Sequence, residues 1–334
     1  MEHTVQNLEW YLEALSKEAL KDICRNFDIK GFSSKNKDEL VKLIVDTYFE
    51  DNTLLIKLLE TLSSDHKLIF FDLAMSENNV TTFNRDIPDT LFLFYPEENE
   101  YLVIPKDVKA HFKEYIEAHN EIKDDMKQIE FYHSALNLYG FVSLKQLSKL
   151  NLKYNRIQMR ESEVKTEIER LLPEYASLIA ENSVKHRDLA EIKLDLKQLT
   201  HGRNYYEPST LEAFLKYNNP YYTDASQAID ALRTLLMQSV SPAYKDTYTG
   251  YLIVNTIIFG LRANDTPEFI LQHIEHIESN GFLNIEDKSN LTEKINEAIN
   301  DSRLWSLNGH KKEQKKTRKI VQVKQKKKKR KKKK

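Results

Sequence analysis

The sequence has 334 residues, of which 40% are hydrophobic and 10% aromatic, enough for two or three folded domains with cores of their own. Its 50 Lys and Arg nearly balance 51 Asp and Glu, so the formal net charge is −1. Only seven Gly and eight Pro occur, which favours helix. The single cysteine, Cys24, excludes an intramolecular disulfide and a cysteine-cluster zinc site.

The balanced total hides a strong charge asymmetry along the chain. Residues 311–334 contain 16 Lys and Arg and one acid, Glu313, a net charge of +15. Residues 1–310 keep 34 basic and 50 acidic residues, a net charge of −16. The sequence therefore predicts an acidic folded body and a low-complexity basic tail, residues 309–334, that self-repulsion keeps disordered.

The most regular pattern lies between Leu12 and Tyr48 and predicts a helical hairpin. Apolar residues recur in its first half at the three- and four-residue steps of one helix face: Leu12, Leu15, Ala19, Leu20, Ile23 and Phe27. We expect Ser16 to cap the main part of this helix. Asn36 and Glu39 have the spacing of a capping box, so a second helix is predicted to start there. Its inward face is expected to carry Leu40, Leu43, Ile44 and Thr47.

The loop of this hairpin is a candidate phosphate contact. Gly31 permits a positive φ, and Phe32 is expected to fill the gap between the helices. Four lysines fall in the loop and at the start of the second helix: Lys30, Lys35, Lys37 and Lys42. We expect the backbone N–H groups at the positive end of that helix to act with them. The alternative is a hairpin that only packs on the rest of the protein.

The segment from Leu20 to Ile44 resembles the small N-terminal helical domain of transcription termination factor Rho, called Rho-N. That fold is similar to the SAP helix–loop–helix unit. Both are found appended to nucleic-acid proteins, so the resemblance implies a nucleic-acid module over residues 8–50 and a link to transcription. Nothing resembling the ATPase domain of Rho follows, so no termination motor is implied.

Residues 52–118 are predicted to form a winged-helix-like domain. Two helices, one beginning near Leu54 and one over Ser64–Met75, precede two β-like runs at 91–95 and 101–105 that read as a hairpin. The run from Tyr101 to Val108 resembles the wing-to-helix exit of winged-helix modules in helicase-associated and uncharacterised bacterial proteins. Such a unit contacts either protein or DNA. Protein contact is favoured here because three acids at the wing tip repel phosphate: Glu97, Glu98 and Glu100.

The remainder of the body is predicted to be helical. Helices over 106–127 and 128–139, the second ended by Gly140, lead into a helical region assigned to residues 122–200. A C-terminal helical domain is predicted over residues 203–308. Residues 300–310 resemble the end of the helical domain in Firmicutes SEC-C-type proteins. The zinc module of those proteins needs a cysteine cluster that this chain lacks, so the resemblance implies no metal site here.

No catalytic motif is recognised, since the chain has no Gly-rich phosphate loop, no Gly-x-Ser-x-Gly and no His-Glu-x-x-His. We therefore expect a non-enzymatic protein without cofactor or metal. His273 and His276 fit a solvated helix face better than a metal site. Trp10 and Trp305 are expected to be core anchors. A tyrosine cluster is expected to be structural, with base stacking as the alternative: Tyr205, Tyr206, Tyr217, Tyr221 and Tyr222.

The tail is the strongest functional signal. Its densest run is Lys326, Lys327, Lys328, Lys329 and Arg330. Such a run neutralises phosphates and releases counterions, so it binds polyanions without sequence specificity. The affinity of this binding falls as the salt concentration rises. The alternatives are contact with anionic lipid and collapse onto the acidic body. No apolar anchor adjoins the tail, so stable membrane attachment is not expected.

Together these patterns predict a mainly α, multi-domain protein: a Rho-N/SAP-like hairpin, a winged-helix-like unit with a small β-hairpin, a helical C-terminal region and a disordered basic tail. DNA or RNA is the expected partner, bound with little specificity. A scaffold that binds a protein partner is the alternative, and an enzyme is a more distant one. The N-terminus lacks a secretion signal, and the longest apolar run, Tyr251–Leu261, is too short to cross a membrane, which predicts a cytoplasmic protein.

Overall fold

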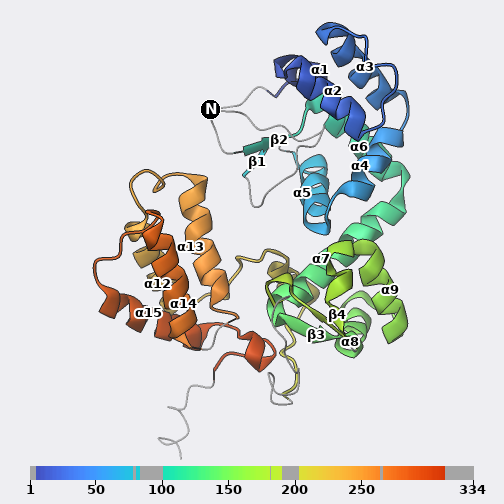
Figure 1. Cartoon of the computed structure of the whole chain (residues 1–334). Coiled ribbons are helices and arrows are strands. Elements are labelled where there is room, and N and C mark those ends of the chain that lie inside the picture. Colours follow the sequence, from blue (N-terminus) through green and yellow to red (C-terminus); the bar gives the residue numbers. More distant parts are fainter. Residues whose placement is uncertain are drawn as a thin grey trace, which may run out of the picture. The chain divides into compact units, whose positions relative to one another are not determined.

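The computed structural model describes residues 5–77, 80–82, 101–180, 182–189, 203–263 and 266–312. This part of the chain is mainly helical with a few short strands, as the sequence predicts (Figure 1). It divides into two compact units. Unit 1 comprises residues 1–133 and 144–182, and unit 2 comprises residues 134–143 and 183–334.

Unit 1 begins with three helices rather than the expected two: α1 (Leu8–Ala14), α2 (Lys17–Asn26) and α3 (Lys37–Glu50). The predicted first helix is interrupted at Leu15 and Ser16, which adopt extended backbone angles. The Ser16 hydroxyl then accepts from the Ala19 N–H at 3.1 Å, so the predicted cap is confirmed as the start of α2. Cys24 is fully buried.

Helices α4 (Thr53–Thr61), α5 (Ser64–Met75) and α6 (Lys106–Ala118) follow in unit 1. Their apolar residues join those of α1 to α3 in one hydrophobic core that extends from Leu8 to Ile116. Within it the Phe70 and Phe112 rings stack with centroids 4.2 Å apart. The Leu8 N–H also donates to Asp107 Oδ1 at 2.9 Å. The residues assigned to a Rho-N-like domain and to a winged-helix-like domain thus share a core.

Two short strands, β1 (Val80–Thr82) and β2 (Tyr101–Val103), pair antiparallel with Val80 opposite Val103. The sequence predicts a different partner for the second strand, the run at 91–95. That run and the acidic wing tip lie outside the described residues. Among the residues described, β2 therefore pairs with the segment after α5.

The helices after α6 begin and end at positions that differ from those expected. A break at His119 separates α6 from α7 (Asn120–Tyr139), so no helix boundary falls at residue 128. The His119 backbone leaves the helical region there, and its N–H donates to the Ile116 carbonyl. Unit 1 then contains α8 (Leu144–Asn155), α9 (Glu161–Leu171), the 3-10 helix η1 (Pro173–Leu178) and strand β4 (Ile179–Ala180). Pro173 opens η1 at its first turn, where its missing N–H costs no helical hydrogen bond.

Unit 2 includes the last residues of α7 and strand β3 (Phe141–Ser143), which pairs antiparallel with β5 (Ser183–Lys185). These strands correct the expectation that residues 122–200 are helical throughout. Two 3-10 turns and a short helix lead to the main bundle: η2 (Arg187–Leu189), α11 (Leu211–Leu215) and η3 (Lys216–Asn218).

The bundle of unit 2 consists of four helices of similar length (Figure 1): α12 (Gln227–Ser239), α13 (Tyr248–Gly260), α14 (Pro267–Ser279) and α15 (Lys288–Asp301). The sequence predicts helices over 225–237, 245–261, 267–280 and 288–300, and each observed helix begins and ends within three residues of these bounds. Side-chain caps start three of them, from Ser226, Thr247 and Asp287. Their apolar faces enclose one core, which includes Leu232, Val254, Ile274 and Ile295.

The bundle is followed by a tight turn around the 3-10 helix η4 (Trp305–Leu307). Its ends meet where the Leu304 N–H donates to the His310 carbonyl at 3.1 Å. The Trp305 indole is 5% exposed, and its Nε1–H donates to the Asn137 carbonyl at 3.1 Å. Trp305 is therefore a core anchor, as expected. It lies directly against Gly140, which has a φ of +65°.

Candidate nucleic-acid interface

The loop between α2 and α3 is held by apolar residues that leave its polar residues exposed. Ile29 is buried, and Phe32 packs half-buried against the core of unit 1. Gly31 has a φ of +78°, the left-handed conformation that the sequence predicts. Lys30, Ser33 and Ser34 are exposed as a result. Residues 29–37 contain three lysines and no acid, so this loop is a local exception in an acidic body.

The four candidate lysines are not equivalent in the structure. Lys30 and Lys42 are exposed, whereas Lys35 and Lys37 are half-buried. Lys37 Nζ donates to the Glu13 carbonyl at 2.6 Å and so ties α3 to α1. Lys42 follows Lys37 by five residues, which places it about 140° around the helix. Lys30 and Lys35 therefore lie in the loop and Lys37 lies at its end, whereas Lys42 lies on a different face of α3 from Lys37.

The N-terminus of α3 contributes less to anion binding than the sequence suggests. The predicted capping box is present: Asn36 Oδ1 accepts from the Glu39 N–H at 2.9 Å, and Glu39 Oε2 accepts from the Asn36 N–H at 2.8 Å. The Glu39 carboxylate therefore already occupies the positive end of the helix. Any phosphate contact at this loop depends on lysine side chains rather than on free backbone N–H groups.

Trp10 is the residue of this region that sequence reasoning placed wrongly. It was expected to be a core anchor, but 56% of its surface is exposed. Leu8 and Leu12 are fully buried and anchor α1, so Trp10 points away from the core. The helical spacing of Leu8 and Leu12 leaves Trp10 off the buried face, and this signal was available in the sequence.

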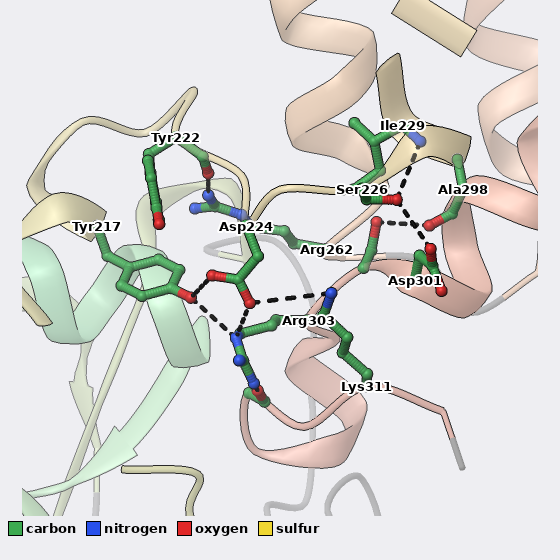
Figure 2. Close-up of polar contacts among 12 residues, drawn as sticks. Tyr217, Tyr222, Asp224, Ser226, Ile229, Arg262, Ala298, Asp301, Arg303 and Lys311 are labelled. Carbon is green, nitrogen blue, oxygen red and sulfur yellow. Dashed lines mark hydrogen bonds and ion pairs between the residues drawn. The ribbon is translucent and has the colours of Figure 1, made fainter. Parts of the chain in front are cut away.

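Two members of the tyrosine cluster of unit 2, Tyr206 and Tyr217, make internal contacts, as the structural interpretation expects. Tyr217 donates its hydroxyl to Asp224 Oδ1 at 2.8 Å (Figure 2). The Arg303 guanidinium lies 3.4 Å from the Tyr206 ring centroid, and its Nε is 2.7 Å from Asp224 Oδ2. Burial raises the pKa of the Tyr217 hydroxyl, which keeps it a neutral donor.

The same network defines where the basic tail leaves unit 2. Lys311 Nζ is 3.9 Å from Asp224 Oδ2, so the first tail lysine faces the carboxylate that Arg303 also contacts (Figure 2). Arg303 Nη1 also donates to the Gly309 carbonyl at 3.2 Å. The remaining predicted contacts, from Lys326 to Arg330, lie outside the described residues.

A buried cation, Arg262, completes this part of unit 2. Its guanidinium donates to the backbone carbonyl of Tyr222 (Figure 2). It also donates to the Asn137 carbonyl at 3.1 Å. Burial lowers the pKa of the Arg262 guanidinium to about 10, so it remains charged at neutral pH. Arg262 is 4% exposed and serves to join chain segments rather than to meet a ligand.

Unit 1 holds a polar cluster that the sequence did not reveal. His133 Nε2 lies 2.6 Å from Ser64 Oγ, and His133 Nδ1 lies 3.1 Å from Asp65 Oδ1. Serine, histidine and aspartate in this order are the groups of nucleophilic catalysis. However, Ser64 is fully buried and its hydroxyl donates to Glu174, which also accepts the Ser64 N–H at 3.1 Å. The cluster therefore stabilises the first turn of α5 and presents no nucleophile to solvent.

Within the described residues, no group of three or more His, Cys, Asp or Glu side chains is placed to hold a metal ion. In the same part of the chain, no helix combines the length and the apolarity needed to cross a bilayer. No protein-family model matches this chain, and neither a curated protein nor a solved structure matches it.

Proposed function

We propose that this chain is a nucleic-acid-associated protein whose basic tail attracts DNA or RNA without sequence specificity, while the loop between α2 and α3 adds a weaker, oriented contact. The observation that carries the proposal is the separation of charge, +15 over residues 311–334 and −16 over residues 1–310. A polyanion is repelled by the body and attracted by the tail. Electrostatic attraction of this kind is the main source of nonspecific nucleic-acid binding.

The hairpin supports the proposal as a second point of attachment. Lys30 is exposed in a loop without acids, and Lys35 and Lys37 follow within seven residues. A strand held by the tail meets this loop at a raised effective concentration, so a contact that is weak alone becomes useful. The resemblance to Rho-N and SAP units favours the same role and a link to transcription. Nothing in the role requires catalysis.

A protein-interaction scaffold is the second candidate. Unit 2 exposes large aromatic residues on its bundle, with Phe269 of α14 62% exposed and Tyr251 of α13 47% exposed. Isolated exposed apolar residues are common on protein surfaces, so this observation is weaker than the charge separation.

The test is binding of the purified full-length chain to labelled duplex DNA, single-stranded DNA and single-stranded RNA at low ionic strength, followed by fluorescence anisotropy. We expect all three to bind, and the affinity to fall steeply and linearly on a log–log scale as salt rises. A chain that binds none of them in dilute buffer contradicts the proposal and favours the scaffold.

A further inference from the structure

Trp10 is an exposed aromatic surface that packing does not explain. A tryptophan side chain is among the largest apolar surfaces a residue can bury, and its burial stabilises a fold by several kcal/mol. The other tryptophan of the chain, Trp305, is only 5% exposed. Trp10 instead leaves 56% of its surface exposed and contacts Tyr11 edge-on, with ring centroids 5.0 Å apart. Such a rigid, open ring is suited to stacking against another planar group.

The geometry of unit 1 brings positive charge to this ring. Trp10 and Glu13 are both exposed and lie three residues apart on α1, about 4.5 Å along the helix axis. Lys37 Nζ donates to the Glu13 carbonyl at 2.6 Å, so the start of α3 meets α1 one turn from Trp10. The end of the lysine-bearing loop is therefore anchored at the last turn of α1, the helix that displays Trp10.

The acids around Trp10 restrict what can stack there. Glu9 and Glu13 are exposed on α1, one residue before and three residues after Trp10, and repel phosphate. A nucleic-acid backbone is therefore favoured along the lysine side, and only an uncharged base can approach Trp10. A base in a duplex is already stacked and paired, whereas a base in a single strand is free to turn toward an aromatic side chain.

We propose that Trp10 stacks against an unpaired base, so that the hairpin of unit 1 selects single-stranded nucleic acid. This inference rests on the proposed function and adds a substrate class to it. The tail binds single strands and duplexes alike through phosphates, whereas Trp10 distinguishes them. Stacking depends little on salt, so the preference for single strands is expected to persist as the electrostatic contribution weakens.

The test uses the full-length chain with oligothymidylate, oligouridylate and a duplex of equal length. We expect Trp10→Ala to weaken binding of the two single strands by about 5- to 100-fold and to leave duplex binding unchanged. Phe269→Ala is the matched control, since Phe269 is similarly exposed, at 62%, but lies on α14 of unit 2. It should change neither the single-strand affinity nor the duplex affinity. Tryptophan emission should be quenched by the single strands in the unmodified chain and not in Trp10→Ala.

The outcomes separate this inference from the proposed function. If the chain binds all three nucleic acids but Trp10→Ala affects none of them, the tail still binds and the stacking role is wrong. Equal losses for single strands and duplex contradict the stacking role as well, because they indicate a general effect on the hairpin. If the unmodified chain binds no nucleic acid, the proposed function itself is wrong.

Discussion

Deletion of residues 313–334 is expected to remove most of the salt dependence of nucleic-acid binding. The deleted segment carries 14 Lys and Arg and one acid, whereas Lys311 is retained opposite Asp224 at 3.9 Å. About six phosphate contacts are enough to cost roughly a thousandfold in affinity between about 50 and 200 mM salt. Three hairpin lysines alone give a log–log slope near −3 at most. We therefore expect the full-length slope to be at least twice that of the truncated chain, measured by anisotropy across a salt series.

The matched control replaces Lys30, Lys35 and Lys42 with glutamine in the full-length chain. Lys37 is left in place because its ammonium donates to the Glu13 carbonyl and supports the packing of α3 on α1. In this variant the log–log slope of affinity against salt should become less steep by no more than about three, and binding at low salt should remain strong. If truncation leaves both the affinity and the slope unchanged, the tail is not the site of attraction.

Gly140→Ala is expected to destabilise unit 2 more than any other single methyl addition at a glycine of the described chain. A Cβ at this position would lie 2.1 Å from Trp305 Cδ2, and φ is +65°. The left-handed backbone costs an L-residue about 1–2 kcal/mol, and overpacking a core adds about 1–3 kcal/mol. The Trp305 ring cannot give way easily, because its Nε1–H is bonded to the Asn137 carbonyl. We expect a loss of about 2–5 kcal/mol in the free energy of unfolding, measured by urea denaturation.

Gly31→Ala measures the cost of a left-handed backbone at an L-residue without the steric clash that occurs at Gly140. Gly31 has a φ of +78°, but a Cβ there would meet nothing within 4 Å. Its substitution should therefore cost only about 1–2 kcal/mol, all from the left-handed conformation. Equal effects of the two substitutions would mean that the contact between Gly140 and Trp305 does not limit the stability of unit 2.

Local features of the fold were predicted well because their causes lie within a few residues. The capping box of Asn36 and Glu39, the Ser16 cap and the positive φ of Gly31 all depend on neighbours along the chain. The four bundle helices follow from apolar periodicity with cap residues at their starts. The division between α6 and α7 was placed wrongly, because no Gly or Pro marks His119 as a break.

Features that depend on distant residues were not predictable from patterns. Ser64, Asp65, His133 and Glu174 come from three separate elements, so their cluster has no sequence signature. The common core of residues 8–50 and 52–118 likewise requires knowing which apolar faces meet. For the candidate interface, the bond from Lys37 Nζ to the Glu13 carbonyl appeared only in the structure. The Glu39 cap at the start of α3 and the exposure of Trp10 both follow from helical spacing, so the sequence already contained those signals.

The most direct test of the central claim is a lysine-acetylation footprint of the full-length chain, with and without bound single-stranded RNA, read by mass spectrometry. Protection is expected across the tail lysines, including Lys326 to Lys329, and more weakly at Lys30 and Lys35. Lys145 of unit 1 and Lys288 of unit 2 are exposed and should remain equally reactive, which makes them internal controls. Protection confined to the folded body, or an unprotected tail in a chain that does bind RNA, would contradict a nucleic-acid interface built on the separation of charge.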